Sequence, residues 1–336
     1  YALRNRKSPL SPFGLGNFDE LDKWILPSLT SLSLDGPFTT YLDFRREADL
    51  NRFQDGNYRA AAIMYAAACE SLLEDLLQHN HWEERIRPED ATANYLTRKG
   101  YPQSIKYLVL NELSRFYSDE GWRKNVPPAI VGWSEYVAQL RNRAVHEGYT
   151  PSGDEMKRCV EAVDALVTFL SDQAFKIRRE HPITALAFLG REGIEKRGGW
   201  SATISRIEAT QEDVAVRNRT FRRWANALSV FRSRDRSIAP KVEGSTCVLV
   251  FESSGCQSFY LIEETGVFAQ KISKEMIHFS SAVEEQLKLI ENNTAPATPQ
   301  VFTLSFESID LEEARWELYS YDVVPGYDVF LPPYEN

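Results

Sequence analysis

Apolar residues recur every three or four positions through much of residues 46–180, the spacing that places them on one side of an α-helix. The strongest case is the run over residues 58–77, YRAAAIMYAAACESLLEDLL, which consists almost wholly of helix-favouring residues and follows Asn57, a candidate N-cap. Its alanines allow a second helix to approach closely. The predicted core stripe of this helix is Ile63, Ala66, Ala67, Glu70, Leu73 and Leu77.

Three later segments show the same period. Helices are predicted over residues 103–118, over 129–145 and from 152 to about 179. Ser152 and Glu155 form a capping box at the start of the last one, and Gly148 is a stop signal for the one before it. The predicted core positions of the helix over 129–145 are Ile130, Trp133, Val137, Leu140 and Ala144. Residues 46–180 are therefore predicted to form a bundle of at least four helices.

The segments around this bundle are less regular. Residues 1–45, rich in Ser, Pro, Gly and Leu, predict an irregular N-terminal arm with one short helix near residues 19–25. Aromatic residues of this arm, such as Phe38 and Tyr41, need burial and are expected to pack on the bundle. Residues 80–102 are interpreted as a polar connection.

Residues 181–240 are predicted to be a basic connecting region that contains a helix over residues 211–232. In that helix arginines interleave with Phe221, Trp224, Leu228 and Phe231. Arginine beside aromatic residues is typical of a surface that contacts RNA. The same pattern also fits a surface helix with an aromatic core face, and the sequence alone does not separate the two interpretations.

The pattern of apolar residues over residues 241–336 differs from that of the helical part of the chain. Alternating and apolar runs predict strands over residues 246–251, 258–262, 300–306 and 316–321, with an amphipathic helix over 272–292. This is the pattern of a small α+β domain. The predicted fold class of the whole chain is therefore mainly α, a helical bundle followed by a small α+β C-terminal domain.

Composition supports a globular protein. The chain has 336 residues, of which 43% are hydrophobic and 26% charged, enough for two domains. No run reaches the roughly 18 apolar residues of a membrane span, and no apolar region follows the N-terminal charges as in a signal peptide. The four cysteines fit no zinc spacing; Cys247 and Cys256 could face each other on a hairpin, but reduced thiols are expected. We therefore expect a cytoplasmic location and no membrane association.

Charge is unevenly distributed along the chain. The net charge of −9 argues against strong nonspecific binding of nucleic acid, yet residues 176–236 hold 14 Lys and Arg against 7 Asp and Glu. A basic stretch inside an acidic chain can follow phosphates, or it can be a solvated helix face. From residue 243 onward there are 16 acidic and 4 basic residues, which suits a protein partner better than a nucleic acid.

The candidate chemistry lies in the stretch LRNRAVHEGY over residues 140–149, which places Arg141 five residues before His146. Arginine binds phosphate oxygens through two parallel hydrogen bonds, and histidine can take a proton from a hydroxyl near neutral pH. Together they could cleave RNA without metal or cofactor, through attack of the ribose 2′-hydroxyl on its own 3′ phosphate. On a regular helix these two side chains lie about 140° apart around the axis. One copy therefore presents them poorly together, whereas a two-fold dimer could build a composite cleft.

The segment Arg141-Asn142-Arg143-Ala144-Val145-His146 resembles the Arg-Asn-x-x-x-His motif of the HEPN (higher eukaryotes and prokaryotes nucleotide-binding) family. The alanine-rich helix with Glu70 and the capped helix after the motif are similar to the family's layout, and the resemblance covers residues 46–180. It implies an all-helical bundle that dimerises through the motif region. It also implies a metal-independent endoribonuclease of a bacterial toxin or anti-phage defence system, with Arg141 and His146 catalytic and Asn142 orienting the phosphate or the histidine.

Two further residues are supporting candidates, and each has an alternative. Glu70 is either a buried acid that orients Arg141 or a carboxylate at the edge of the core stripe. A toxin branch of the family has a tyrosine two residues after the histidine, which its antitoxin adenylylates; here Gly148 stands there and Tyr149 follows. For the whole protein, the alternative is a noncatalytic scaffold or sensor that binds a partner protein or a nucleotide, with Arg141 and His146 only stabilising a helix end.

Overall fold

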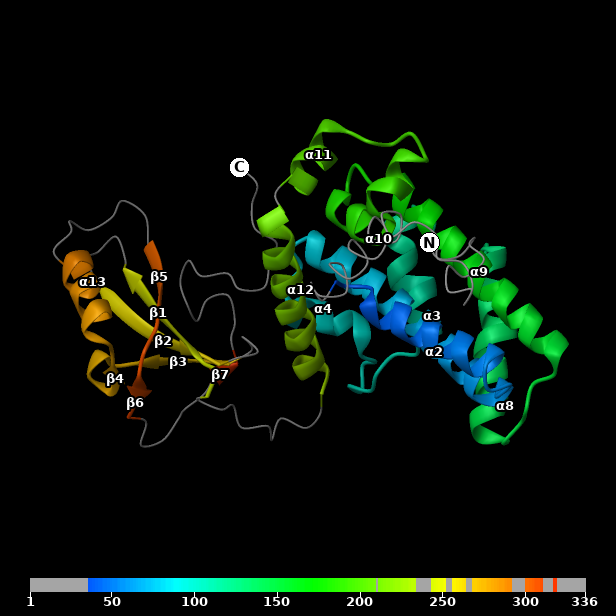
Figure 1. Ribbon diagram of the computed structural model, residues 1–336, viewed down its shortest axis with the longest axis horizontal. Helices are drawn as coiled ribbons and strands as arrows, with labels where there is room; N and C mark the ends of the chain where they lie inside the picture. The colour runs from blue at the N-terminus through cyan, green and yellow to red at the C-terminus, as the bar shows by residue number, and fades with distance from the viewer. Residues whose placement is uncertain are drawn as a thin grey trace, which may run out of the picture.

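The computed structural model of the chain describes residues 36–209, 211–233, 243–251, 256–263, 268–291, 300–310 and 317–318. Within these ranges the protein is mainly helical, with a small antiparallel sheet near the C-terminal end of the sequence (Figure 1). The predicted fold class is confirmed at this level. The short helix predicted near residues 19–25 lies outside the described residues.

The bundle starts with α2 (Thr39–Phe53) and α3 (Tyr58–Glu83), which pack against each other along their lengths. The prediction that residues 1–45 are irregular was wrong from residue 39 onward. Helix α2 buries only Ala48, so its weak apolar pattern gave no signal; an ion pair of 3.3 Å between Arg45 Nη1 and Asp164 Oδ1 helps to hold it. Phe38 is buried, as predicted.

Helix α3 begins where the sequence predicted, because the side chain of Asn57 accepts a hydrogen bond from the amide of Ala60. Its predicted core stripe was only half right. Ala66, Leu73 and Leu77 are buried, whereas Ile63, Ala67 and Glu70 are half-buried at the edge of the contact. The buried face is rotated toward Ala62, Cys69, Leu72 and Leu76. An alanine-rich helix can bury a broad face, so its spacing alone does not fix which line of residues is deepest.

Two interrupted helices cross this layer. The first runs through α5 (Ile105–Leu108), a π-helical segment over Val109–Leu113 and α6 (Ser114–Tyr117). The second runs through α7 (Pro128–Gly132), a π-helical segment over Trp133–Ala138 and α8 (Gln139–His146). The sequence predicted both helices but not the wide turns inside them. All five predicted core positions of the second are buried: Ile130, Trp133, Val137, Leu140 and Ala144.

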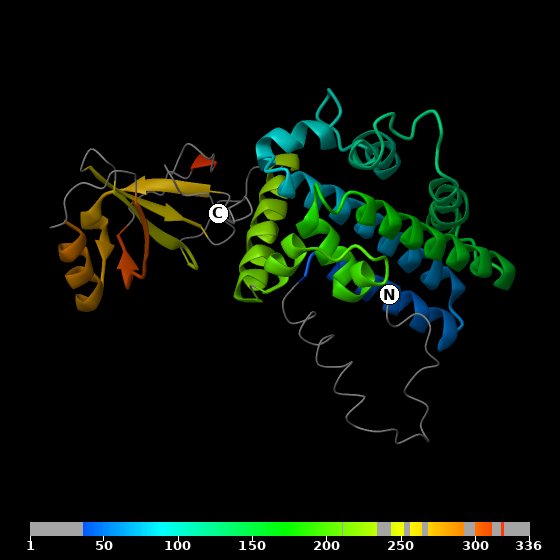
Figure 2. The same ribbon diagram turned by 90° about the horizontal axis from the view of Figure 1, so that it is seen from above.

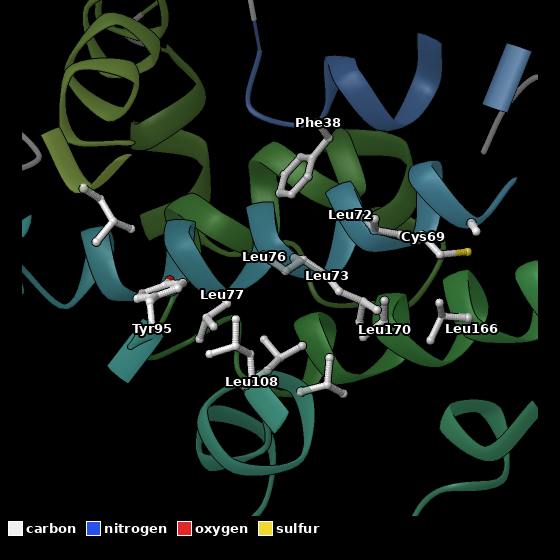
Figure 3. Packing of buried hydrophobic residues seen from close by; sticks show 14 of the residues in the cluster. Phe38, Cys69, Leu72, Leu73, Leu76, Leu77, Tyr95, Leu108, Leu166 and Leu170 are labelled. Carbon is white, nitrogen blue, oxygen red and sulfur yellow. The ribbon is translucent and has the colours of Figure 1, made fainter. Parts of the chain in front are cut away.

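Helix α9 (Gly153–Lys176), drawn in green in Figure 2, packs against α3 and against the second interrupted helix and so closes the core. The predicted capping box between Ser152 and Glu155 is present at its start. Figure 3 shows the resulting core, in which Leu72, Leu73 and Leu76 of α3 lie between Phe38 and the α9 residues Leu166 and Leu170.

The polar connection predicted over residues 80–102 was wrong in part, because α3 extends to Glu83 and α4 (Pro88–Tyr95) follows it. Helix α4 packs against α12 (Gln211–Arg232). The indole Nε1 of Trp224 donates a 2.8 Å hydrogen bond to the carbonyl of Ile86, just before α4.

The basic region also contains α10 (Pro182–Glu195) and α11 (Ala202–Ala209), and a break at Gly190, with φ 65°, interrupts α10. In α12, Phe221, Trp224 and Leu228 are buried in the bundle. They are therefore closed to nucleic-acid bases, and the interpretation of α12 as a helix with an aromatic core face is the correct one. Phe231, the fourth residue of this set, is half-buried and packs against the same core.

The C-terminal sheet has the strand order β5-β1-β2-β3-β7, with every neighbouring pair antiparallel. The strands are β1 (Thr246–Phe251), β2 (Gln257–Ile262), β3 (Phe268–Ile272), β5 (Gln300–Leu304) and β7 (Glu317–Leu318). A second ladder joins β4 (Ile277–His278) to β6 (Ser308–Ile309), after a short 3-10 turn over Lys274–Met276. The predicted helix over 272–292 is shorter, as α13 (Ser281–Glu291), because β4 takes up its first part.

Alternate residues of the sheet point to two cores. Cys247, Leu249 and Leu261 pack with Leu287 of α13, whereas Val248 and Val250 belong to the same hydrophobic cluster as α12. Cys247 pairs in register with Leu261, so Cys256 lies at the opposite end of the hairpin and the two thiols cannot form a disulfide. No helix among the described residues is long and apolar enough to cross a membrane.

Candidate active site

The motif lies on α8, the last two turns of the interrupted helix that begins at Pro128. Leu140 and Ala144 anchor α8 to the bundle because they continue the buried line of Trp133 and Val137. The side chains that do not fall on this line face outward. Asn142 and His146 are exposed and Arg141 is half-buried. The three predicted catalytic residues therefore lie at the surface, near one end of the bundle (Figure 1).

The side chains of Arg141 and Asn142 are hydrogen-bonded to each other. The Nη1 of Arg141 donates a 3.1 Å hydrogen bond to the side-chain oxygen Oδ1 of Asn142. No described residue is hydrogen-bonded to the other guanidinium nitrogen, Nη2, or to the amide nitrogen of Asn142, so both can donate to a phosphate. In this arrangement Asn142 positions the arginine, and no described hydrogen bond links it to His146.

The helix geometry keeps Arg141 and His146 on different faces. Because α8 is regular from Gln139 to His146, the two side chains are about 140° apart around its axis. Val145 lies between them, four residues after Arg141, and is 46% exposed. An exposed apolar side chain in the middle of a polar face is a natural contact for a second molecule.

Glu70 reaches this site from α3, which packs against α8. Burial raises the pKa of the Glu70 carboxyl above its ordinary value, and the nearby charge of Arg141 counteracts that effect. The two side chains act on each other through space rather than as an ion pair. The interpretation of Glu70 as a carboxylate at the edge of the core stripe is confirmed, because it is half-buried there, and its role in orienting Arg141 stays a prediction.

The loop after His146 is fixed by a compact network. The chain leaves the helix through Gly148, with φ 65°, and the amide of Tyr149 donates a 3.2 Å hydrogen bond to the carbonyl of Arg143. The hydroxyl of Tyr149 donates a 2.7 Å hydrogen bond to Oε2 of Glu155. The guanidinium of Arg143 lies 3.6 Å from the centre of the Tyr149 ring and donates to Oε1 of Glu155 at 3.2 Å.

Glu155 is the centre of this network, since it also accepts hydrogen bonds from the amide and hydroxyl of Ser152. The backbone amide of Ser152 is the main cause that lowers the pKa of Glu155 to about 2, with a further contribution from the Tyr149 hydroxyl. Arg59 ties the same loop to α3, through the carbonyl of Tyr149 at 3.3 Å and the hydroxyl of Thr150 at 2.9 Å. Tyr149, a supporting candidate, is thereby engaged in holding the loop.

Sequence reasoning missed Arg143, Glu155 and Arg59 as parts of the site. Glu155 was visible as the third residue of a capping box, but nothing in the sequence showed that its carboxylate also binds Arg143 and Tyr149. Arg59 is ninety residues from its partner Tyr149 along the chain, a separation that local patterns do not bridge. Among the described residues, no group of three or more His, Cys, Asp and Glu side chains is arranged to hold a metal ion.

No protein-family model, no curated protein and no solved structure matches the chain.

Proposed function

We propose that this chain is a HEPN-like, metal-independent endoribonuclease of a bacterial toxin or anti-phage defence system, active as a homodimer. The observation that supports the proposal is the surface placement of Arg141, Asn142 and His146 on a well-anchored helix end. A catalytic group must reach the solvent to meet a polymer substrate.

The proposed reaction is an internal transesterification. His146 takes the proton of a ribose 2′-hydroxyl, and the 2′ oxygen forms a bond to the adjacent phosphorus. The bond from phosphorus to the 5′ oxygen of the next nucleotide breaks, and that oxygen receives a proton from a protonated histidine. Arg141, held by Asn142, binds the two nonbridging oxygens while negative charge accumulates on them. The products are a 2′,3′-cyclic phosphate and a 5′-hydroxyl.

The dimer follows from the angle between the two side chains. Since Arg141 and His146 of one protomer lie on different faces of α8, we propose that the arginine of one copy meets the histidine of the other. Val145, exposed between them, would be buried at the two-fold contact. The half-buried Glu70 behind the interface would keep Arg141 oriented toward the cleft.

The direct test is RNA cleavage by the purified protein in the presence of EDTA. His146→Ala is expected to lose at least about 100-fold in rate, the usual contribution of a general acid or base. Arg141→Lys should also lose most activity, because lysine lacks the planar fork. His278→Ala is the matched control: this histidine is also exposed, but it lies in the C-terminal region and pairs with Asp310. Full activity of His146→Ala, or loss of activity in EDTA, would contradict the proposal.

One observation favours a second function. No hydrogen bond joins His146 to another described side chain, so none of the described side chains orients its ring as a base. The alternative is a noncatalytic scaffold or sensor subunit, in which the bundle only dimerises and the acidic C-terminal region holds a partner protein. Expression in a bacterial host separates the two: toxicity relieved by His146→Ala supports the nuclease. A harmless wild-type protein that co-purifies stoichiometrically with another chain supports the scaffold.

A further inference from the structure

A hollow of about 380 Å³ lies where the end of α9 meets the turn between α10 and α11. Arg178 and Arg179 line it from one side, and Trp200, Ser201 and Thr203 line it from the other. None of the residues that line it carries a carboxylate. Two guanidinium groups beside hydroxyl donors, with no acid among them, are a lining that attracts an anion.

The turn that forms one wall is held tightly against α9. Gly198 has φ 67°, a conformation that other residues rarely adopt. A side chain at Gly199 would place its Cβ 2.2 Å from Cε2 of Phe175 and 2.5 Å from Nε of Arg178. Two glycines in succession therefore let this turn approach α9 closely, and the position of the hollow is set by the backbone.

Arg178 is held in place by contacts that do not include an acidic side chain. Its Nη1 donates a 2.9 Å hydrogen bond to the carbonyl of Phe175, and its Nε donates a 3.4 Å hydrogen bond to the carbonyl of Gly199. Its guanidinium also lies 4.0 Å from the centre of the Phe175 ring. Carbonyl groups and an aromatic face orient the cation without neutralising it. Arg179, next along the chain, is exposed.

The acidic side chains nearby form ion pairs with other cations, except for Glu180. Among the described residues, neither Arg178 nor Arg179 forms an ion pair. Glu180, which follows them, instead acts on His181. The neighbouring pairs are Asp172 with Arg197 at 3.1 Å, Glu192 with Lys196 at 2.6 Å, and Glu195 and Glu208 with Arg191 at 2.8 and 3.1 Å. Arg178 and Arg179 are thus two adjacent cations that no carboxylate among the described residues pairs with.

We propose that this hollow, the Arg178–Arg179 site, binds a backbone phosphate of single-stranded RNA at a distance from the bond that is cut. The inference rests on the proposed function, since it gives the same substrate a second point of attachment. Trp200, held from one side by the guanidinium of Arg191 at 5.0 Å, adds an aromatic wall beside the two arginines. Positive charge next to an aromatic ring is the combination that binds single strands without sequence preference.

The length of α9 sets the RNA length that this site requires. The motif loop is attached to the start of α9 through Glu155, whereas the Arg178–Arg179 site lies just past its end. Figure 1 shows α8 and α11 at opposite ends of the bundle. Helix α9 has 24 residues, which corresponds to about 36 Å. At about 3.4 Å per nucleotide of a stacked strand, roughly ten nucleotides are needed to reach from one site to the other.

The test measures binding of uncleaved RNA by the His146→Ala protein, with fluorescent single strands of about 8 and about 24 nucleotides. Arg179→Glu is expected to weaken binding of the longer RNA at least about fivefold. The slope of log K, the association constant, against log salt concentration should also become shallower by about one or more. The shorter RNA should bind within about twofold of the unchanged protein. Lys288→Glu, which makes the same change of charge at an exposed position of α13, is the control and should alter neither affinity.

The outcomes separate this inference from the proposed catalysis. Equal affinity for both RNAs, or equal weakening by Arg179→Glu and Lys288→Glu, would overturn the Arg178–Arg179 site even if the wild-type protein cleaves RNA. Length-dependent binding that requires Arg179, in a wild-type protein that cleaves nothing, would support the site and remove the nuclease. If neither the shorter nor the longer RNA binds, the Arg178–Arg179 site is overturned.

Discussion

The hydroxyl of Tyr149 offers a sharp test of how the motif helix is held. Tyr149→Phe removes the 2.7 Å hydrogen bond to Glu155 and leaves the ring in place beneath the guanidinium of Arg143. The substitution therefore changes one polar contact without creating a cavity. Because the loop between His146 and α9 depends on this network, its stability and the order of the end of α8 should fall together.

The magnitude follows from the partners that remain. A hydrogen bond to a charged group contributes about 1.5–3 kcal/mol to stability. Glu155 keeps its three other donors from Ser152 and Arg143, so its carboxylate is not left unpaired, and the expected cost is at the lower end, about 1–2 kcal/mol. For a domain of this size that corresponds to a fall in Tm of about 3–6 °C.

Thermal unfolding followed by circular dichroism at pH 7 measures this difference. Tyr136→Phe is the matched control, since Tyr136 is 43% exposed and its hydroxyl makes no hydrogen bond to a described residue. The control should change stability by less than about 0.5 kcal/mol. Hydrogen exchange of the Glu147 and Tyr149 amides, which both bond to the carbonyl of Arg143, should accelerate only in Tyr149→Phe. Equal Tm values for the two variants would refute the anchoring role of this loop.

Three further changes test other parts of the structure by thermal unfolding. The pKa of Glu155 is lowered to about 2 in the folded protein, whereas in the unfolded chain it is near 4. The ionised carboxylate therefore contributes its full stabilisation above about pH 4, and this stabilisation is lost as the pH falls toward 2. Glu155→Gln should make the free energy of unfolding less dependent on pH in this range. Burial raises the pKa of Asp75 to about 7, so its ionised form destabilises the fold as the pH rises from about 4 to 7; Asp75→Asn should stabilise by about 2–4 kcal/mol at pH 8 and much less at pH 4. Gly148→Ala should cost about 1 kcal/mol because φ is 65° there, whereas Gly153→Ala, at a glycine with a negative φ and equally open space, should not destabilise; the opposite order would contradict the backbone assignment.

The elements that the sequence predicts well are those with strong local signals. The helix over residues 129–145 has an apolar residue at each contact with the bundle, and all five of its predicted core positions are buried. The capping box of α9 is likewise a local pattern of Ser152 and Glu155. Each of these follows from the period of a helix or from a hydrogen bond between residues close in sequence.

The errors arise where distant contacts decide the structure. Helix α2 has a single buried residue and is held partly by Arg45 and Asp164, which are 119 residues apart. The line of deepest burial on α3 depends on which neighbours surround it, and an alanine-rich sequence does not reveal them. In the same way, the sequence located Arg141 and His146 on an exposed helix end, but the loop network around Tyr149 depends on Arg59 of another helix.

Complementation between two inactive variants tests most directly whether the reactive groups come from two copies. Arg141→Ala and His146→Ala proteins are purified separately, mixed under conditions that exchange protomers, and assayed for RNA cleavage, with mixed dimers quantified by native mass spectrometry. If each site combines the arginine of one protomer with the histidine of the other, a mixed dimer contains one intact site, and an equal mixture should regain about a quarter of wild-type activity. Mixed dimers that form in full but cleave no RNA would contradict a composite site.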